Sequence, residues 1–501
     1  MPKPSSRILI TLILIGILLL SLGIRLIDLS DPPLDFNPTR QMRSAIIARG
    51  LYYENTSNTD PERLALAVTH MNAMERLEPP ILESLVAFTY GLMKAEHLWV
   101  ARVFVSVFWL IGALFLFDLG RRMTSPLAAL VGVSIFLFLP FSIRASRSFQ
   151  PDPVMVTLII LTAWALYLWQ EKRTWKWALL AGLFGGLAVL VKIVAVFFVA
   201  GLTLGVVPYA LGFGKESKGE ETSQWRLSTL KSGLRDPRIW VMAVFMVTPA
   251  LVYYLWRFGE TDSGSFLHWT ILTRWREVLT PSFYMRWMVY LDDILGLVLI
   301  IAALVGSLVT TPRNQAFLWG FWGGYLIFGL FFPYHIITHD YYHLPLVALI
   351  SLSLMPLVNL VIGIVIKNGK FAQIALVAVL VLFFAYHGWI GRSIIVGQDF
   401  RDHPEFWQSV GENIPADAKS IGLSQDYGMR LMYYGWRTFT PWSNNTEPEV
   451  LPELAERFSY FVVTAKNQMS EPLAQYLETH YPIHAEGPGY IIYGLTAPLT
   501  P

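Results

Sequence analysis

The sequence predicts an all-α polytopic membrane domain over residues 1–390, followed by a small C-terminal α/β domain outside the membrane over residues 391–501. Composition predicts the first part, because 54% of the 501 residues are apolar and only 15% are charged, which is far from the balance of a soluble domain. Apolar runs of about 20 residues also recur up to residue 390. A change of periodicity after residue 391 predicts the second part.

Segments long enough to cross a membrane begin at the N-terminus. Ile8–Leu22 follows Lys3 and Arg7, and we interpret it as a retained helix with a cytoplasmic N-terminus. The alternative is a cleaved signal peptide, for which Ser21-Leu-Gly23 offers a small-x-small cleavage pattern. About eleven transmembrane helices are predicted in all, the others at about 98–119, 124–141, 153–170, 177–191, 193–212, 238–256, 289–310, 316–332, 343–366 and 371–390.

The run Pro80–Ala95 is ambiguous, and the basic loops decide its interpretation. If it crossed alone, the loops with Arg121-Arg122, Lys172–Lys176 and Lys215–Arg238 would not all share a side with the N-terminus, contrary to the positive-inside rule. We therefore predict a half-helix or surface helix. The outer side then holds residues 28–96, 142–153, the turn at Lys192, 257–288, 333–343 and the chain after about 391. This describes a multi-pass protein of the cell (plasma or inner) membrane with an extracytoplasmic C-terminal domain.

The first outer loop carries a dense group of charges directly after the first helix. Asn37-Pro38 is typical of an N-cap with proline at the first helical position, so Arg40 and Arg43 should share one face of a short helix. Asp35 would then meet two cations at the bilayer surface, which suits a reaction on a phosphate-bearing lipid. The alternative is an interfacial helix whose charged residues only solvate its outer face.

Two further outer turns carry cations. The turn between residues 143 and 153 brings Arg144, Arg147 and Asp152 to the outer side, between two membrane helices where such residues are otherwise avoided. Lys192 is a single cation between two apolar runs that are each barely long enough to span. An ionisable residue at membrane depth indicates function, although a lysine near a helix end also snorkels without any role.

The remaining outer loops are rich in aromatic and histidine residues. Segment 257–288 holds His268 among Trp and Arg residues, as an interfacial segment should. Segment 333–345 holds three histidines, including His339, next to Asp340. Metal ligation is compatible with that composition but is not the favoured interpretation, because His339 and Asp340 are adjacent in the chain.

The chain after residue 391 predicts a mixture of short elements. Ser420–Ser424 and Tyr460–Thr464 are predicted to be buried strands, Tyr427–Tyr434 and Glu471–Thr479 to be helices, and His484–Gly494 to be a strand pair. The segment contains no phosphate-binding glycine motif, nucleophile elbow or zinc signature. Its pattern therefore predicts a fold but no chemistry.

Composition and the distribution of charge weigh against several classes of function. The absence of cysteine excludes disulfides, thiolate metal sites and a cysteine nucleophile, and a net charge of +2 indicates no nucleic-acid partner. A transporter or lipid-linked sugar flippase would use the same cations as a passage, but the candidate residues all fall on one side, whereas transporters bind substrate near the midplane. A receptor or scaffold with the C-terminal domain as binding module is a third class.

Several motifs, in their order and spacing, resemble one family. They are a Pro-Pro pair that opens a membrane segment after the first loop, Ser146-Arg147 with Asp152-Pro153, Gly186–Lys192, and Tyr341-Tyr342 with Pro345. With the acidic first outer loop and the outer α/β tail, they resemble the GT-C glycosyltransferases. The most similar branch is that of dolichyl-phosphate-mannose protein mannosyltransferases and lipid A aminoarabinose transferases. The resemblance covers most of the chain.

This resemblance implies an inverting transfer of a sugar from a polyprenyl-phosphate donor to a hydroxyl of a protein, lipid or glycan acceptor. By position, Asp35 and Asp152 match the family's first-loop and second-loop acidic residues, and Lys192 matches the lysine between paired helices. The chain departs from relatives in having Asp35-Phe36 where they often have Asp-Glu. It also has Glu78 before the Pro-Pro pair, where they often have His or Lys.

Breaking a sugar–phosphate bond requires that the leaving phosphate be stabilised and the incoming hydroxyl be deprotonated. We predict Asp35 as the general base, with Asp152 as the reserve candidate. The predicted contacts of the donor phosphate are Arg144, Arg147, Lys192, Arg40 and Arg43, and the predicted substrate contacts are Glu78, His268, His339 and Tyr341. No bound metal or other cofactor is predicted, although a divalent cation is compatible with the sequence. Membrane lipids are the remaining expected partners.

Overall fold

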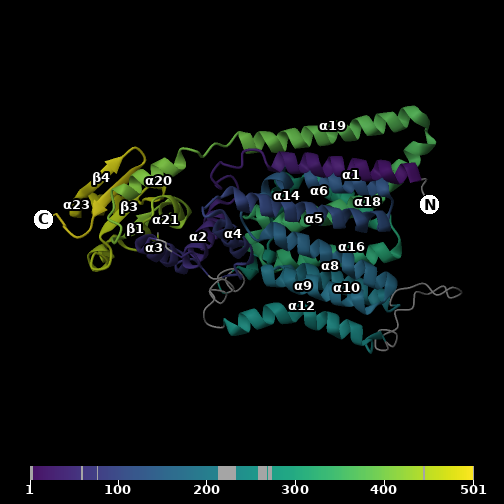
Figure 1. Cartoon of the computed structure of the whole chain (residues 1–501), viewed down its shortest axis with the longest axis horizontal. Coiled ribbons are helices and arrows are strands. Elements are labelled where there is room, and N and C mark those ends of the chain that lie inside the picture. The colour runs from purple at the N-terminus through teal and green to yellow at the C-terminus, as the bar shows by residue number, and fades with distance from the viewer. Residues whose placement is uncertain are drawn as a thin grey trace.

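A computed structural model describes residues 4–57, 60–75, 77–212, 233–257, 268, 274–443 and 446–499. Long helices run side by side along the longest axis, and a small sheet domain lies at one end of the bundle (Figure 1). Helices α2, α3 and α4 lie between the bundle and the sheet (Figure 1). The first helix begins at the end of the bundle that is remote from the C-terminus, so the two termini lie at opposite ends of the molecule (Figure 1).

The helices of the bundle and of the first outer loop follow the apolar runs of the sequence. In the first half they are α1 (Pro4–Arg25), α2 (Pro38–Glu54), α3 (Pro61–Asn72), α4 (Ile81–Met93), α5 (Trp99–Met123), α6 (Pro126–Phe138), α7 (Pro140–Ala145), α8 (Asp152–Lys172), α9 (Trp175–Val191) and α10 (Ala195–Ala210). In the second half they are α12 (Pro237–Trp256), α14 (Pro281–Leu295), α15 (Leu297–Leu308), α16 (Pro312–Phe331), α17 (Pro333–Ile336), α18 (Leu344–Lys367) and α19 (Gly369–Val396). Proline in the first turn starts many of them, because its missing N–H is unpaired there in any case.

All eleven predicted segments coincide with helices, but they differ in length. Within the described ranges, six helices are long and apolar enough to span a membrane, or seven if one bent pair is a single span. The transmembrane segment predicted at about 289–310 is divided between two helices, α14 and α15, which meet at 96°. Gly296 stands at the break with a φ of +84°, a conformation that glycine adopts without steric cost. Helices α6, α9 and α10 are shorter apolar helices of 13, 17 and 16 residues.

Helix α4 is the run whose crossing was ambiguous. It has 13 residues, so it is about 20 Å long at 1.5 Å per residue, short of the ~30 Å of hydrocarbon. The loop around Lys215 lies mostly outside the described residues. The positive-inside count that separated the two interpretations of α4 therefore stays an argument from sequence.

Glycine allows two pairs of helices to approach closely beside the site described below. A Cβ at Gly201 of α10 would lie 2.4 Å from the carbonyl oxygen of Gly320 in α16. A Cβ at Gly186 of α9 would lie 2.1 Å from the carbonyl oxygen of Phe245 in α12. Small residues at such crossings let membrane helices pack backbone to backbone. They hold α12 against α9 and α10 against α16.

The C-terminal domain is a five-stranded mixed sheet with the strand order β2-β1-β3-β5-β4. Strand β1 pairs in parallel with β2 and β3, and β5 pairs antiparallel with β3 and β4. The strands are β1 (Lys419–Leu423), β2 (Thr438–Pro441), β3 (Tyr460–Val463), β4 (Ile483–Gly487) and β5 (Tyr490–Gly494); the helices are α20 (His403–Glu412), α21 (Met429–Tyr434), α22 (Leu451–Leu454) and α23 (Glu471–His480). The predicted strands and helices are confirmed within a few residues, while β2, α20 and α22 were not predicted.

This domain is attached to the first outer loop by specific contacts. The hydroxyl of Thr39 in α2 donates to a carboxylate oxygen of Asp426 at 2.8 Å. The guanidinium of Arg49 in the same helix lies over the ring of Tyr433 at 3.6 Å and donates to its carbonyl oxygen. Asp426 and its neighbour Tyr427 both have positive φ angles, which non-glycine residues rarely adopt. Helix α2 is thus fixed from the outside as well as by the bundle.

Candidate active site

A pocket of about 420 Å³ opens where the first outer loop meets α9, α10 and α12. One end is polar and is lined by Arg40, Glu78 and Lys192. The walls leading away from it are apolar, formed by Val189, Val196, Met246, Val247, Ala250 and Leu251. Such a pocket is complementary to a ligand with a charged head and an apolar chain, because each part meets groups of its own kind.

Arg40 reaches the pocket because Pro38 starts α2 two residues earlier. Its Nε donates to the hydroxyl of Tyr341 at 3.3 Å, and its guanidinium lies 5.5 Å from the centre of that ring. A second guanidinium nitrogen lies 3.7 Å from Oε1 of Glu78. With its side chain 18% exposed, Arg40 remains open to a ligand in the pocket.

Glu78 is a buried carboxylate among cations. Its Oε1 atom is shielded from solvent and accepts no hydrogen bond. Burial raises the pKa of Glu78, but the positive charges of Arg43, Arg40 and Lys192 outweigh burial and hold that pKa below its usual range. Arg43 is itself fixed by hydrogen bonds to the carbonyl oxygen of Glu75. The residue is therefore an anion at neutral pH, and its Oε1 faces Arg40 without forming a hydrogen bond.

Lys192 follows the last residue of α9 and projects from the break between α9 and α10. Its Nζ donates to both carboxylate oxygens of Asp152 at 2.8 Å. The ammonium also lies 4.7 Å from the ring centre of Tyr341 and 5.2 Å from that of Tyr342. Asp152 opens α8, where the helix dipole favours a carboxylate. The lysine has firm partners and is not merely snorkelling.

Asp340 joins two of the outer segments. One of its oxygens accepts a hydrogen bond from Nδ2 of Asn37 at 2.7 Å, and the other accepts one from Arg144 at 3.1 Å. The side chain of Asp340 is 16% exposed. Asn37 was predicted to cap α2, but it adopts a φ of 46° and its side chain makes no cap hydrogen bond. Its amide is engaged by Asp340 instead.

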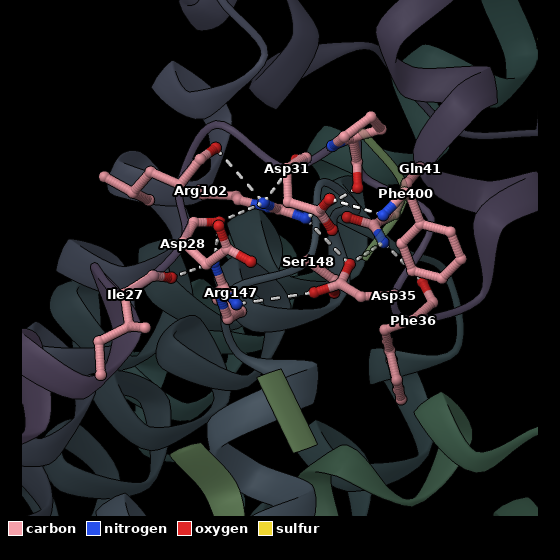
Figure 2. Close-up of polar contacts among 12 residues, drawn as sticks. Ile27, Asp28, Asp31, Asp35, Phe36, Gln41, Arg102, Arg147, Ser148 and Phe400 are labelled. Carbon is pink, nitrogen blue, oxygen red and sulfur yellow. Dashed lines mark hydrogen bonds and ion pairs between the residues drawn. The ribbon is translucent and has the colours of Figure 1, made fainter. Parts of the chain in front are cut away.

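Asp35 lies in a different cluster, together with Arg102 and Arg147 (Figure 2). We call it the sealed cluster because its side chains are buried. The Oδ1 atom of Asp35 accepts hydrogen bonds from Arg102 and Gln41, each at 3.1 Å, and its Oδ2 lies 3.7 Å from Arg147. Its side chain is 5% exposed, and those of both arginines are at most 2% exposed. Burial raises the pKa of Asp35, but Arg102, Arg147 and the Gln41 hydrogen bond hold it below its usual range. Other terminal nitrogens of the two arginines donate to backbone carbonyls, including that of Asp28, whereas both Nε atoms are buried without a hydrogen-bond partner.

The predicted site residues therefore divide into groups. Arg40, Glu78, Lys192 and Tyr341 meet around the pocket, with Arg43 and Asp152 directly behind them. Arg144 lies at the Asp340 junction, whereas Asp35 and Arg147 pair with each other in the sealed cluster. Asp340 and Asn37, which the sequence did not single out as site residues, join Arg144 to the start of α2. The roles assigned to these side chains remain predictions.

The histidines next to the pocket are neutral. Burial, followed by the positive charges of neighbours that include Arg40 and Lys192, lowers the pKa of His335 to about 3 and that of His339 to about 4. His335, His339 and His343 recur at every fourth position, a spacing that suits metal ligation, but His343 bonds Tyr325 and a backbone carbonyl. The described part of the chain contains no group of three or more His, Asp or Glu side chains arranged for a metal.

Two other features are distinct from this pocket. A cleft of about 850 Å³ between α1, α6, α18 and α19 is larger, but its lining is apolar apart from Ser134, Gln373 and Arg392. Because it offers one charged group and no carboxylate, it lacks the chemistry that the polar pocket provides. His268, predicted as a substrate contact, is exposed and is flanked on both sides by residues outside the described ranges.

Comparison with solved structures identifies the architecture. The chain matches ArnT from Cupriavidus metallidurans bound to undecaprenyl phosphate with a TM-score of 0.59 and 15% identity, over 99% of both chains. The apo state of that protein matches with a TM-score of 0.58 and 14% identity, over 98% of both chains. The Archaeoglobus fulgidus oligosaccharyltransferase tethered with an acceptor peptide matches with a TM-score of 0.55 and 14% identity, over 95% of this chain and 72% of the other.

The chain has the GT-C fold. Residues 77–230 also match the model of the dolichyl-phosphate-mannose-protein mannosyltransferase family, whereas no protein of curated function matches the sequence. The predicted resemblance to the protein mannosyltransferase and aminoarabinose transferase branch is thus confirmed. The family match contains Glu78, Asp152 and Lys192 but neither Arg40 nor Asp340. In this GT-C chain, the polar end of the pocket therefore combines residues from inside and outside the matched region.

Proposed function

We propose that the protein transfers a sugar from a polyprenyl-phosphate donor to an acceptor hydroxyl, with inversion at the anomeric carbon, on the extracytoplasmic side of the membrane. The observation that carries this proposal is the pocket itself, in which Arg40 and Lys192 stand at the head of an apolar channel between α9, α10 and α12. A polyprenyl phosphate has a charged phosphate at one end and a long hydrocarbon chain, so its parts match the charged and the apolar lining of the pocket. The relative crystallised with undecaprenyl phosphate supports this class of donor.

The positive charges of Arg40 and Lys192 can stabilise the polyprenyl phosphate as it leaves the sugar. When the bond between the anomeric carbon and the phosphate oxygen breaks, the polyprenyl phosphate gains negative charge, and charge-assisted hydrogen bonds from Arg40 and Lys192 stabilise it. Lys192 holds Asp152 with two of its three donors, so one remains for the phosphate. The side chain of Tyr341 is in contact with both cations and fixes their directions.

The acceptor hydroxyl must lose a proton as its oxygen attacks the anomeric carbon. The sequence prediction assigned this role to Asp35, whose oxygens face Arg102, Arg147 and Gln41 in a sealed cluster. A general base must come within hydrogen-bond reach of the proton that it removes. We therefore propose Asp340 as the base, because its side chain is 16% exposed against 5% for Asp35. Asp152, the reserve candidate from the sequence, is 3% exposed and both of its oxygens accept from Lys192, so it is no better placed than Asp35.

An in vitro transfer assay tests the function directly. Purified full-length protein in lipid nanodiscs is incubated with radiolabelled polyprenyl-phosphate sugars and with membrane extracts that supply protein, lipid and glycan acceptors. Label that moves from the lipid to an acceptor supports the transferase. A second preparation, with the same protein reconstituted in sealed vesicles, tests the alternative. Label that crosses the vesicle bilayer while still attached to its lipid would support a flippase.

Sidedness has a separate test, since the pocket and the C-terminal domain lie on the same end of the bundle. Single cysteines introduced at Ser57 and Ser443 should both react with a membrane-impermeant thiol reagent in intact cells. The native chain has no cysteine, so labelling reports only on the introduced residue. Labelling of one site alone would contradict the proposed topology.

A further inference from the structure

The polar end of the pocket has an unusual charge balance for a phosphate site. Arg40, Arg43 and Lys192 supply three positive charges, while Glu78 and Asp152 supply two negative charges. Glu83 lies behind Arg43, where its carboxyl accepts a hydrogen bond from Ser44, and it is left out of this count because burial raises its pKa and so favours its neutral form. The nearby Arg144–Asp340 pair adds no net charge. One net positive charge is left to meet a ligand.

The two lipids of the proposed reaction differ by one charge. The donor is a phosphodiester and carries one negative charge, whereas the released polyprenyl phosphate is a monoester whose second pKa near 6 makes it mostly doubly charged at neutral pH. In the transfer, the acceptor oxygen bonds the anomeric carbon, the bond to the phosphate oxygen breaks, and the acceptor proton passes to the base. The lipid phosphate thus gains a charge while it is still in the pocket.

We propose that Glu78 makes the pocket selective for the singly charged phosphodiester over the doubly charged product, and so favours release of the spent lipid. This inference rests on the proposed function and concerns the same site. The carboxylate of Glu78 lines the pocket beside Arg40. Its Oε1 accepts no hydrogen bond, so no donor within hydrogen-bond distance offsets the negative charge of that oxygen. A monoanion leaves the site neutral, whereas a dianion leaves an excess negative charge that Glu78 repels in a poorly hydrated pocket.

The geometry gives Glu78 this role without contact to the reacting atoms. Its charge acts through the cations that hold the phosphate, so it is a selectivity residue and not a catalytic residue. Removing its charge should raise the net charge of the cluster to two, which matches the product. The pocket would then retain its own leaving group.

The test compares two lipids that need no knowledge of the sugar: undecaprenyl phosphate, and its methyl phosphodiester as an inert mimic of the donor. Binding of both to full-length protein in nanodiscs is measured at pH 8. Glu78→Gln should bind undecaprenyl phosphate about tenfold more tightly than the native chain does, with a clearly smaller change for the methyl diester. Glu78→Asp, which keeps the charge, should restore the native ratio of the two affinities.

Matched controls separate this effect from a general disturbance. Glu75→Gln removes a carboxylate that is exposed and three residues away, and it should leave both affinities unchanged. Arg43→Gln removes a positive charge and should shift the ratio in the opposite direction, so the inference stays testable if Glu78→Gln unfolds. Equal changes for both lipids in Glu78→Gln, or no change, would overturn the inference and leave the donor site intact. Failure of the native chain to bind either lipid would overturn the proposed function together with it.

Discussion

Two clusters of carboxylates and cations lie against the same outer loop, and they differ in their access to a pocket. In the sealed cluster around Asp35, the terminal nitrogens of Arg102 and Arg147 point at the carboxylate and at backbone carbonyls, and all three side chains are at most 5% exposed (Figure 2). The Nε atom of each arginine is buried without a hydrogen-bond partner, as is Oε1 of Glu78. The open cluster around Glu78 differs because Arg40 is 18% exposed and a pocket opens beside it. Neither charge nor an unpaired polar atom alone therefore indicates a site, whereas access from a pocket does.

The largest effect should come from the proposed base. Asp340→Asn keeps the size of the side chain and one of its two accepting oxygens but cannot accept a proton, so turnover in the transfer assay should fall about 10²- to 10⁴-fold. Unfolding temperature should change little, because the side chain is partly exposed. Turnover close to that of the native protein would remove Asp340 from catalysis and move the assignment to Asp152 or Asp35.

The sealed cluster should respond in stability instead. Arg102→Ala leaves the Asp35 carboxylate buried beside only one remaining arginine, and breaking a buried pair in this way costs about 3–5 kcal/mol. Chemical denaturation of the purified protein measures the loss. The folded fraction should bind undecaprenyl phosphate as the native chain does. A large change in lipid affinity without loss of stability would show that the two clusters are not separate.

Donor binding should depend on the open cluster. Lys192→Ala removes a charge-assisted contact from a poorly hydrated site, which costs on the order of 1.5–3 kcal/mol, so the affinity for polyprenyl phosphate should fall about ten- to a hundredfold. Asp152 would lose its partner as well, so Lys192→Arg is the companion variant that keeps a cation there. Unchanged donor affinity in Lys192→Ala would assign the lysine to a structural role.

The smallest expected effect is a pH dependence of stability that comes from the histidines buried beside the open cluster. The pKa values of His335 and His339, about 3 and about 4, lie below the ordinary 6.5, so the unfolded chain takes up protons on acidification before the folded chain does. The free energy of unfolding should therefore fall as the pH drops from 6.5 towards 4. Unfolding temperatures at pH 7 and pH 5 measure the effect. His339→Gln should reduce the fall, whereas replacing the exposed His480 of α23 by Gln should not.

The sequence predicted the helices of the bundle well because apolar runs of about 20 residues have few alternatives in a bilayer. It did not predict the break at Gly296, because one glycine within an apolar run leaves the run intact by hydropathy. It also missed β2, whose four residues are too few for a clear alternation.

The candidate site was predicted in part. Arg40, Glu78 and Lys192 stood out as charges between apolar segments, and the structure brings them to one pocket. The assignment of Asp35 followed its position in the loop, but which cation each carboxylate meets depends on packing between segments that are far apart in the chain. The contact of Asp340 with Asn37 spans 303 residues, and no local pattern indicates it.

The hydrogen bond between Thr39 and Asp426 has a consequence for engineering. Thr39 immediately precedes Arg40, so the C-terminal domain is bonded to the turn of α2 that presents Arg40, the side chain proposed to bind the donor phosphate. A chimera that exchanges this domain for that of another protein of the same fold would leave the turn without its outer support. Such a chimera should keep the placement of Arg40 only if the first turn of α2 is exchanged together with the domain.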